Sequence, residues 1–228
     1  FTYSANSANN PVMQYFPICL NLAGKKCLVV GAGSVGRRKV RNLLEYGAED
    51  ILLVDSQATL KSEQEFAAYE QVDIQKRHFD KSDVLDKFLV FVCTWDRELN
   101  EHIGEICRRK GILCNIATSP EQGDFIQPAL LKQGELSITV SSHGKSPALV
   151  KKIKDRLKQD IGPEYATLTE ILGRLRAPVL DLQKDSSYNK EIFDSLTDKD
   201  ILDAVKDEDG ERVLQLLQAK TPSSLHSN

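Results

Sequence analysis

The hydrophobic positions in the first half of the chain gather into short apolar runs, and amphipathic stretches separate these runs. Continuous apolar runs of about four to eight residues are typical of strands buried on both faces of a parallel sheet. Strands that alternate with helices at this spacing predict right-handed crossovers and a doubly wound parallel sheet, an α/β fold. We predict strands at 26–30, 51–55, 72–79, 88–94 and 112–117, and helices at 36–47, 57–71 and 100–111.

The pattern changes after residue 116. Residues 129–142 combine a short apolar segment, a turn signal at Gln133 and Gly134 and an alternating strand, which together predict a β-hairpin. From Pro147 onward the apolar spacing is helical, and a strand-poor tail cannot extend a parallel sheet. We expect a sheet domain at 13–116, a strand-containing central region at 117–150 and a helical domain at 151–228, with residues 1–12 a disordered extension before a natural start at Met13.

Composition narrows the classes of function. The chain has 228 residues, a formal net charge of −3 and 41% hydrophobic residues, which suits one or two globular domains and gives no basic face for nucleic acid. No apolar run approaches the length that spans a membrane, and the first residues lack the features of a secretory signal. Five cysteines, an odd count without a CxxC pair, indicate reduced thiols in a cytoplasmic protein rather than disulfides or a zinc site.

A glycine-rich loop follows the first predicted strand and opens the first predicted helix. In the pattern GxGxxG, Gly31 permits a tight turn, Gly33 lets the backbone approach a pyrophosphate, and Gly36 allows close helix–strand contact. The N–H groups at the start of that helix, together with its dipole, favour an anion. A turn that merely requires glycines, or a dinucleotide fold that has lost its ligand, are the alternatives.

Asp55 ends the second predicted strand, nineteen residues past Gly36. A carboxylate at this point accepts hydrogen bonds from the adenosine ribose and disfavours a 2′-phosphate, which indicates NAD rather than NADP. We therefore predict a Rossmann-type NAD site that contains Gly31, Gly33, Ser34, Val35, Gly36 and Asp55.

Four basic residues follow the loop: Arg37, Arg38, Lys39 and Arg41. Charges on the first turns of a helix most often form a solvated face. Cations at a helix N-terminus oppose the dipole, so we expect another group to compensate them.

Three segments of the chain resemble one family. They are PICLNLAGKKCLVVGAGSVGRRKVRNLLEYGA, CNIATSPEQGDFIQPALL and ITVSSHGKSPALVKKIKDRL. Together they resemble the precorrin-2 dehydrogenases, which form the N-terminal part of siroheme synthase and also occur as stand-alone enzymes. The resemblance covers about residues 16–175 in the same order with almost no gaps. The glycine loop alone does not distinguish this family, whereas the other two segments do.

The resemblance implies a three-part fold, with an NAD-binding domain, a central dimerisation region and a C-terminal helical domain. It implies a homodimer whose chains interlock through the central region, with the substrate in a cleft between domains. The implied reaction is the NAD-dependent oxidation of precorrin-2 to sirohydrochlorin, a step of siroheme and related tetrapyrrole biosynthesis. Some members of the family also insert ferrous iron.

The resemblance also implies roles for individual residues. Thr94 matches the small polar residue that lies against the cofactor after the central strand. Asn115 matches the asparagine of the CN motif, and Phe125 and Pro128 match the wall of the substrate cleft. Ser142 matches the serine of the family's SS-G-G segment.

Two positions depart from the family. Thr118 stands where siroheme synthases carry an aspartate that is the usual candidate acid–base group, and a threonine hydroxyl cannot act as a carboxylate base. Asp124 is a candidate replacement, and so is His143, which stands where the family commonly has glycine. An imidazole suits proton uptake near neutral pH, although a loop histidine that faces water is the alternative. The candidate catalytic residues are Asn115, Asp124, Ser142 and His143.

The implied substrate is a macrocycle with many carboxylates, which calls for cations and hydroxyl groups around a broad cleft. We assign Lys145 and Ser141, in the serine loop, to substrate binding together with Asn115, Phe125, Pro128 and Ser142. A helix that begins near Pro147 would add N–H groups for a carboxylate. The basic residues at 151–156 are interpreted as a solvated helix face.

Three functions are compared. The main hypothesis is an NAD-dependent precorrin-2 dehydrogenase without a metal site, because the four histidines are scattered and the aspartate is missing. A bifunctional dehydrogenase and sirohydrochlorin ferrochelatase is the second hypothesis, with Asp124 or His143 in place of the aspartate. A non-catalytic module that binds a tetrapyrrole or NAD is the third, and it rests on Thr118.

Overall fold

A computed structural model describes residues 14–182 and 184–226. The expected extension and the proposed start at Met13 lie outside the described residues. The chain divides into two compact units, one ending at Gln127 and one beginning at Pro128. The predicted division into three regions stays a prediction.

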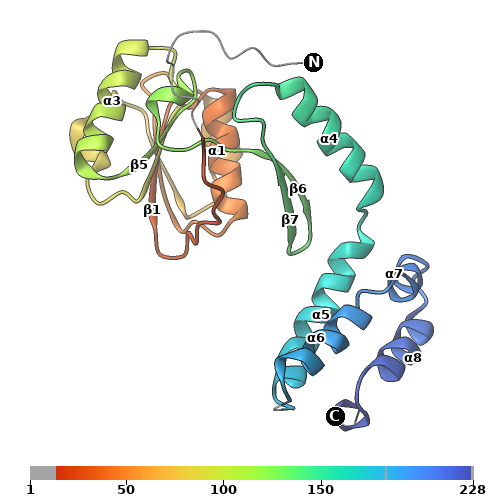
Figure 1. Cartoon of the computed structure of the whole chain (residues 1–228). Coiled ribbons are helices and arrows are strands. Elements are labelled where there is room, and N and C mark those ends of the chain that lie inside the picture. The colour runs from red at the N-terminus through yellow and green to blue at the C-terminus, as the bar shows by residue number, and fades with distance from the viewer. Residues whose placement is uncertain (1–13, 183, 227–228) are drawn as a thin grey trace, which may run out of the picture. The chain divides into compact units, whose positions relative to one another are not determined.

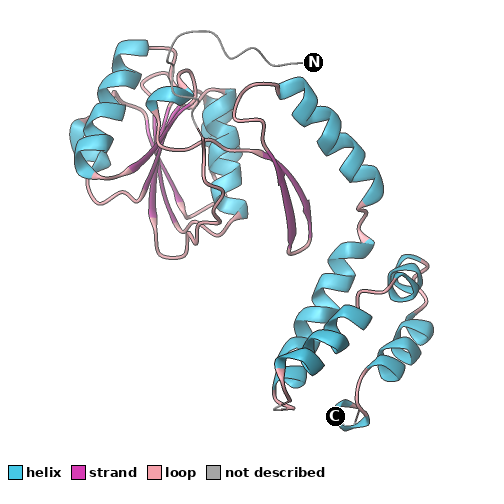
Figure 2. Ribbon diagram, in the orientation of Figure 1, coloured by secondary structure: helices cyan, strands magenta, loops and turns pink. Residues whose placement is uncertain are grey.

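The first unit contains a five-stranded parallel sheet in the order β3-β2-β1-β4-β5 (Figures 1 and 2). The strands are β1 (Lys26–Val30), β2 (Asp50–Val54), β3 (Val72–Gln75), β4 (Leu89–Val92) and β5 (Leu113–Ile116). The predicted doubly wound α/β fold is confirmed. Because β1 lies between β2 and β4, the chain reverses its direction of winding at β1, and ligands of such sheets bind beyond the carboxyl ends of the strands at that point.

Three helices connect these strands: α1 (Ser34–Glu45), α2 (Leu60–Phe66) and α3 (Arg97–Lys110). Two short 3₁₀ helices, η1 (Lys81–Val84) and η2 (Pro120–Gln122), complete the unit. Gly111 ends α3 in the left-handed conformation at φ 67°. The third strand is shorter than predicted because Arg77 turns away from the sheet, where its guanidinium binds both carboxylate oxygens of Asp83 at 2.7 and 2.8 Å.

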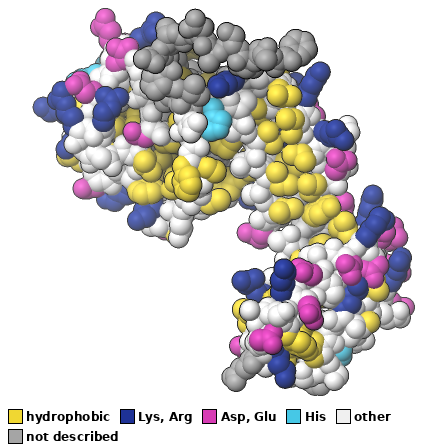
Figure 3. All heavy atoms as spheres, in the orientation of Figure 1, with side chains coloured by type: hydrophobic (Ala, Val, Ile, Leu, Met, Phe, Trp, Pro, Cys, Tyr) yellow, Lys and Arg dark blue, Asp and Glu magenta, His cyan; other side chains and the backbone are white. Residues whose placement is uncertain are grey.

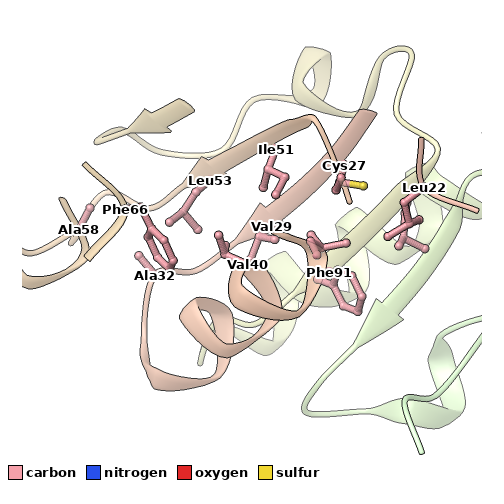
Figure 4. Packing of buried hydrophobic residues seen from close by; sticks show 13 residues of the cluster. Leu22, Cys27, Val29, Ala32, Val40, Ile51, Leu53, Ala58, Phe66 and Phe91 are labelled. Carbon is pink, nitrogen blue, oxygen red and sulfur yellow. The ribbon is translucent and has the colours of Figure 1, made fainter. Parts of the chain in front are cut away.

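Each face of the sheet has its own apolar core. Val29, Leu53 and Phe91 pack with Val40 of α1 on one face, which Figure 4 shows from close by. On the other face, Leu28, Val90 and Ile116 pack with Ile103 and Cys107 of α3. Burial on both faces explains why the strands read as continuous apolar runs.

The cysteines of the first unit differ in exposure. Cys27, Cys107 and Cys114 are buried and Cys19 is exposed. Burial raises the pKa of the Cys27 and Cys93 thiols to about 11, which keeps both protonated near neutral pH.

The second unit begins with the predicted β-hairpin, which is confirmed. Strands β6 (Ala129–Gln133) and β7 (Leu136–Val140) are antiparallel and joined at Gly134, whose φ is 57°. The helices are α4 (Pro147–Asp160), α5 (Glu164–Leu180), α6 (Ser186–Ser195), α7 (Lys199–Lys206) and α8 (Gly210–Lys220), followed by the short η3 (Ser223–Leu225).

Two parts of the second unit differ in burial. Leu168, Val179, Leu196 and Ile201 form a closed core among the later helices. In contrast, no residue of α4 is buried, and Figure 3 shows apolar side chains gathered over this helix. In the described part of the chain, no helix is long and apolar enough to cross a membrane.

Candidate dinucleotide and substrate site

The glycine loop lies at the carboxyl end of β1 and is shaped by contacts that only glycine allows. Gly31 has a φ of 103° and donates its N–H to the carbonyl of Val54 at 2.8 Å. A Cβ on Gly31 would lie 2.8 Å from the carbonyl group of Cys93. A Cβ on Gly36 would lie 1.7 Å from the carbonyl oxygen of Gly31. The first and third glycines of the motif are therefore required by the fold itself.

Gly33 differs from the other two glycines because a Cβ at this position would meet no atom within 4 Å. Gly33 is also the N-cap of α1, and no side chain caps this helix or places an acid in its first turn. In contrast, the carboxylate of Asp96 caps α3 through the N–H of Leu99. Open space in front of uncapped N–H groups fits a pyrophosphate, which supplies the missing negative charge.

Asp55 follows the carboxyl end of β2 and binds the glycine loop directly. Its Oδ2 accepts the N–H of Ala32 at 2.6 Å, and its Oδ1 accepts the N–H of Gln57 at 2.7 Å. Each carboxylate oxygen retains a further lone pair, so these bonds leave room for the hydroxyls of a ribose. The predicted ribose ligand is thus also a structural support of the loop.

The basic residues after the loop have the compensating group that we expected. Arg37 Nε lies 2.9 Å from Glu65 Oε2, and Arg41 Nη1 lies 3.3 Å from Glu65 Oε1. Arg37 Nη1 also donates to the carbonyl of Ala32 at 3.0 Å. The carboxylate of Glu65, on α2, therefore neutralises cations that the dipole of α1 disfavours.

The interpretation of these residues as a solvated face is wrong for Lys39, which is 7% exposed. Its Nζ donates to Gln127 Oε1 at 2.5 Å and lies 5.0 Å from the centroid of the Phe91 ring. Burial lowers the pKa of the Lys39 ammonium, the neighbouring Cys93 opposes this shift, and Arg38 adds to it. No carboxylate of the described residues forms an ion pair with this ammonium.

Asn100, on α3, connects the carboxyl ends of β4 and β5. Thr94 Oγ1 donates to Asn100 Oδ1 at 2.5 Å, while Asn100 Nδ2 donates to the carbonyl of Thr94 and to Thr118 Oγ1, both at 3.0 Å. Thr118 stands where siroheme synthases carry an aspartate. Asn100 therefore links this position to Thr94, the predicted cofactor contact. The sequence analysis missed Asn100, although a buried asparagine on the apolar face of an amphipathic helix was a usable signal.

Asn115 and Phe125 lie beside this network on the α1 face of the sheet. Asn115 Nδ2 donates to the carbonyl of Phe125 at 2.8 Å, and Asn115 Oδ1 is buried without a hydrogen-bond partner. The rings of Phe125 and Phe91 meet edge to face at 5.5 Å. An unsatisfied acceptor inside a packed aromatic wall is costly unless a donor reaches it.

Asp124 lies alongside β5 rather than beyond its carboxyl end. Its Oδ2 accepts the N–H of Cys114 at 2.9 Å, and its own N–H donates to the carbonyl of Cys114 at 2.8 Å. These two hydrogen bonds to the backbone of Cys114 give Asp124 a structural role at the edge of the sheet.

The serine loop belongs to the second unit and leads into α4. Ser142 Oγ accepts the N–H of Ser146 at 2.9 Å, and Ser146 Oγ caps α4 by accepting the N–H of Leu149 at 3.3 Å. His143, whose N–H is accepted by Ser141 Oγ at 3.1 Å, has a φ of 51°. This left-handed conformation explains why the family commonly has glycine at the position.

The predicted site residues fall into two groups. The structure brings together the glycine loop, Asp55 and Thr94 at the carboxyl edge of the sheet, with Asn115 and Phe125 beside them. Asp124 also lies in the first unit, but alongside β5. The remaining residues belong to the second unit: Pro128, Ser141, Ser142, His143 and Lys145.

A parallel sheet of this order, an uncapped glycine loop and an acid at the end of β2 define a Rossmann-type dinucleotide-binding domain. Residues 18–129 match a family described as putative NAD(P)-binding, and residues 133–159 match the family described as sirohaem biosynthesis protein central. The chain thus resembles the precorrin-2 dehydrogenases and part of the siroheme synthases.

Individual relatives agree with this assignment. The siroheme synthase of Nitrosococcus oceani is 35% identical over 73% of this chain and 35% of its own length. Siroheme synthase 2 of Pectobacterium atrosepticum is 31% identical over 90% of this chain and 45% of its own length. The chain thus spans less than half the length of these relatives. The solved structure of SirC, precorrin-2 dehydrogenase, has a TM-score of 0.74 and 26% identity, covering 90% of this chain and 98% of SirC.

Proposed function

We propose that this chain is an NAD-dependent oxidoreductase that converts precorrin-2 to sirohydrochlorin in siroheme biosynthesis. The observation that carries the proposal is the uncapped, sterically open Gly33 at the start of α1, in a chain whose fold matches 98% of SirC. This chain matches only part of the length of the siroheme synthases. We therefore assign to it only the dehydrogenase activity, and no other activity of those proteins.

In the proposed reaction a hydride and a proton leave the macrocycle. When bound, NAD supplies the oxidant, because its nicotinamide ring accepts the hydride. The loop at Gly33 holds the pyrophosphate and Asp55 holds the ribose, which directs the other end of the cofactor across β1 toward Thr94. Thr94, Asn100 and Thr118 form a hydrogen-bonded floor there. Asn115 and Phe125 form the adjacent wall.

The proton requires a different acceptor from the one in siroheme synthases. The hydroxyl of Thr118 already accepts a bond from Asn100, and the carboxylate of Asp124 is bound to the backbone of Cys114. We therefore assign proton uptake to His143, with Ser142 and Lys145 binding substrate carboxylates at the N-terminus of α4. This assignment places the acid–base chemistry on the second unit.

We further propose a cytoplasmic homodimer that binds neither nucleic acid nor membrane. Support for the dimer comes from α4, where Leu149 is 53% exposed, Ile153 is 40% exposed and no residue is buried. A second copy that covers this helix would remove apolar surface from water. Sedimentation of the purified protein tests the stoichiometry, and Leu149→Asp is expected to yield monomers.

The activity is tested by incubating the protein with precorrin-2 and NAD while recording NADH and sirohydrochlorin. Equal formation of both products is expected, with none in Gly33→Val. Tight tetrapyrrole binding without NADH would instead support the non-catalytic module. Addition of ferrous iron after sirohydrochlorin has formed tests the bifunctional hypothesis, for which insertion must exceed the spontaneous rate.

A further inference from the structure

Trp95 is the single tryptophan of the chain, and its side chain is 94% exposed. It is the most exposed of the large apolar side chains in the described part of the chain. Scattered exposed apolar residues are normal, but an indole usually buries most of its area and finds a partner. The exposure of Trp95 therefore requires an explanation.

The turn that carries Trp95 is held on both sides by hydrogen bonds. Before it, the carbonyl of Thr94 accepts a bond from Asn100 Nδ2 at 3.0 Å. After it, the N–H of Asp96 donates to Thr94 Oγ1 at 3.2 Å, and the carboxylate of Asp96 caps α3. The backbone on each side of Trp95 is thus tied to the end of β4 and to the start of α3.

The position of this turn relates Trp95 to the cofactor. A Cβ on Gly31 would lie 3.1 Å from the backbone nitrogen of Thr94, so the glycine loop touches the residue before Trp95. β1 lies between β2 and β4. In such a sheet the adenosine half of a dinucleotide lies toward the strand that carries Asp55, and the nicotinamide half lies toward β4. Trp95 lies three residues past the end of β4, so it flanks the place where a substrate must meet the nicotinamide.

A second exposed aromatic belongs to the same edge of the sheet. The hydroxyl of Tyr15 donates to the carbonyl of Pro120 at 3.4 Å, which brings the N-terminal segment to the loop beyond β5. The next residue, Phe16, is 86% exposed. The two most exposed large apolar side chains in the described chain are therefore carried by segments at the carboxyl edge of β4 and β5.

We propose that the indole of Trp95 packs against the face of the tetrapyrrole macrocycle and positions it beside the nicotinamide. This inference rests on the proposed function. A macrocycle of linked pyrrole rings has carboxylates at its rim and an apolar, conjugated face. An indole is suited to that face because flat π-systems pack with large contact area. The ammonium of Lys145, in the serine loop, does not provide such a contact.

The first experiment measures tetrapyrrole affinity. Uroporphyrin is the probe, because it is a stable octacarboxylate whose absorbance changes on binding. Trp95→Ala is expected to raise its Kd about tenfold, and Trp95→Phe is expected to raise it less. Leu85→Ala is the matched control, since Leu85 is 51% exposed but precedes the amino end of β4, at the opposite edge of the sheet. An unchanged Kd in Trp95→Ala overturns the proposal.

The second experiment tests contact. The wild-type indole is modified with a hydroxynitrobenzyl reagent, and the peptide that carries Trp95 is quantified by mass spectrometry. Uroporphyrin is expected to protect Trp95, whereas NAD alone is expected to leave it reactive. Protection by NAD alone, or equal modification with and without uroporphyrin, contradicts the assignment.

Kinetics separate this inference from the proposed function. In Trp95→Ala the KM for precorrin-2 is expected to rise while the KM for NAD stays the same. Wild-type turnover with an unaltered precorrin-2 KM in Trp95→Ala would refute the Trp95 contact and leave the dehydrogenase intact. Porphyrin binding that depends on Trp95, in a protein that never forms NADH, would refute the dehydrogenase and support the contact.

Discussion

The carboxylate oxygen Oδ2 of Asp55 lies 2.6 Å from the backbone nitrogen of Ala32. This bond joins the end of β2 to the middle of the glycine loop, twenty-three residues earlier in the chain. The acid that is predicted to select the cofactor therefore also shapes the loop that binds it. Removal of this acid is expected to have two effects.

We predict that Asp55→Ala raises the Kd for NAD about tenfold or more. The ratio of the affinity for NAD to the affinity for NADP should also fall. Loss of the ribose contact lowers affinity for NAD alone, whereas loss of the Ala32 anchor affects both cofactors. Calorimetric titration of each cofactor measures the two effects. Asp55→Asn is the control that keeps one acceptor for Ala32. Unchanged preference in Asp55→Ala would show that Asp55 only supports the loop.

The three glycines of the loop are expected to respond differently to substitution. Gly33→Val should fold normally, because the position faces open space at an ordinary φ of −64°, yet it should abolish detectable NAD binding. Gly36→Ala should fail to fold stably, because its Cβ would overlap the carbonyl oxygen of Gly31. Thermal melting and NAD titration of both variants make the comparison. Normal NAD affinity in Gly33→Val would refute the pyrophosphate site.

Asn100 is expected to be a major support of the site. Thr118→Val leaves Asn100 Nδ2 without one of its acceptors and should lower the free energy of unfolding by about 1–3 kcal/mol. Thr118→Asp restores the residue of siroheme synthases and supplies a stronger acceptor. The urea concentration at the midpoint of its unfolding should therefore equal or exceed that of the wild type. Urea titration distinguishes the two. If both variants lose the same stability, the Asn100 bond to Thr118 contributes little.

Lys39 gives the protein a pH-dependent stability with a defined sign. Burial lowers the pKa of this ammonium in the folded state, so between that pKa and its ordinary value the unfolded chain binds more protons, and stability rises with pH. Below the folded-state pKa the cost of burying the charge is fully present.

We predict that Lys39→Met is more stable than the wild type by about 1 kcal/mol at neutral pH, and that this difference shrinks as pH approaches about 10. Urea unfolding at a series of pH values measures the difference. Lys76→Met, at an exposed lysine, should show no such trend. A wild-type stability that falls relative to Lys39→Met as pH rises would contradict the burial of a charged amine.

His143 carries backbone strain that glycine would relieve. At a φ of 51° its Cβ crowds the backbone, so His143→Gly should raise the free energy of unfolding by about 0.5–1 kcal/mol. The matched change is Gly144→Ala, at a φ of 79°, which should destabilise the protein although no atom lies near the new Cβ. If His143→Gly also keeps full turnover of precorrin-2, the imidazole is not the proton acceptor.

Local patterns were sufficient to predict the sheet, the hairpin and the glycine loop. The buried strands read as apolar runs because both of their faces are covered, and the loop reads as GxGxxG because two of its glycines touch backbone. These features depend on neighbours in sequence, or on a packing environment that every strand of such a sheet shares. The predicted third strand was too long, because the ion pair of Arg77 and Asp83 that ends it had no local signal.

The contacts that surround the site depended on the tertiary structure. Lys39 reads as one of four solvated cations, yet it is buried because Gln127, eighty-eight residues away, covers its ammonium. Glu65 neutralises Arg37 only because α2 packs beside α1, and Asn100 joins two threonines only because β4 and β5 are adjacent. The sequence alone therefore determined which backbone elements form and which cofactor class they suit. Only the folded chain decided which polar side chains are paired, because those pairs join segments that the sheet topology brings together.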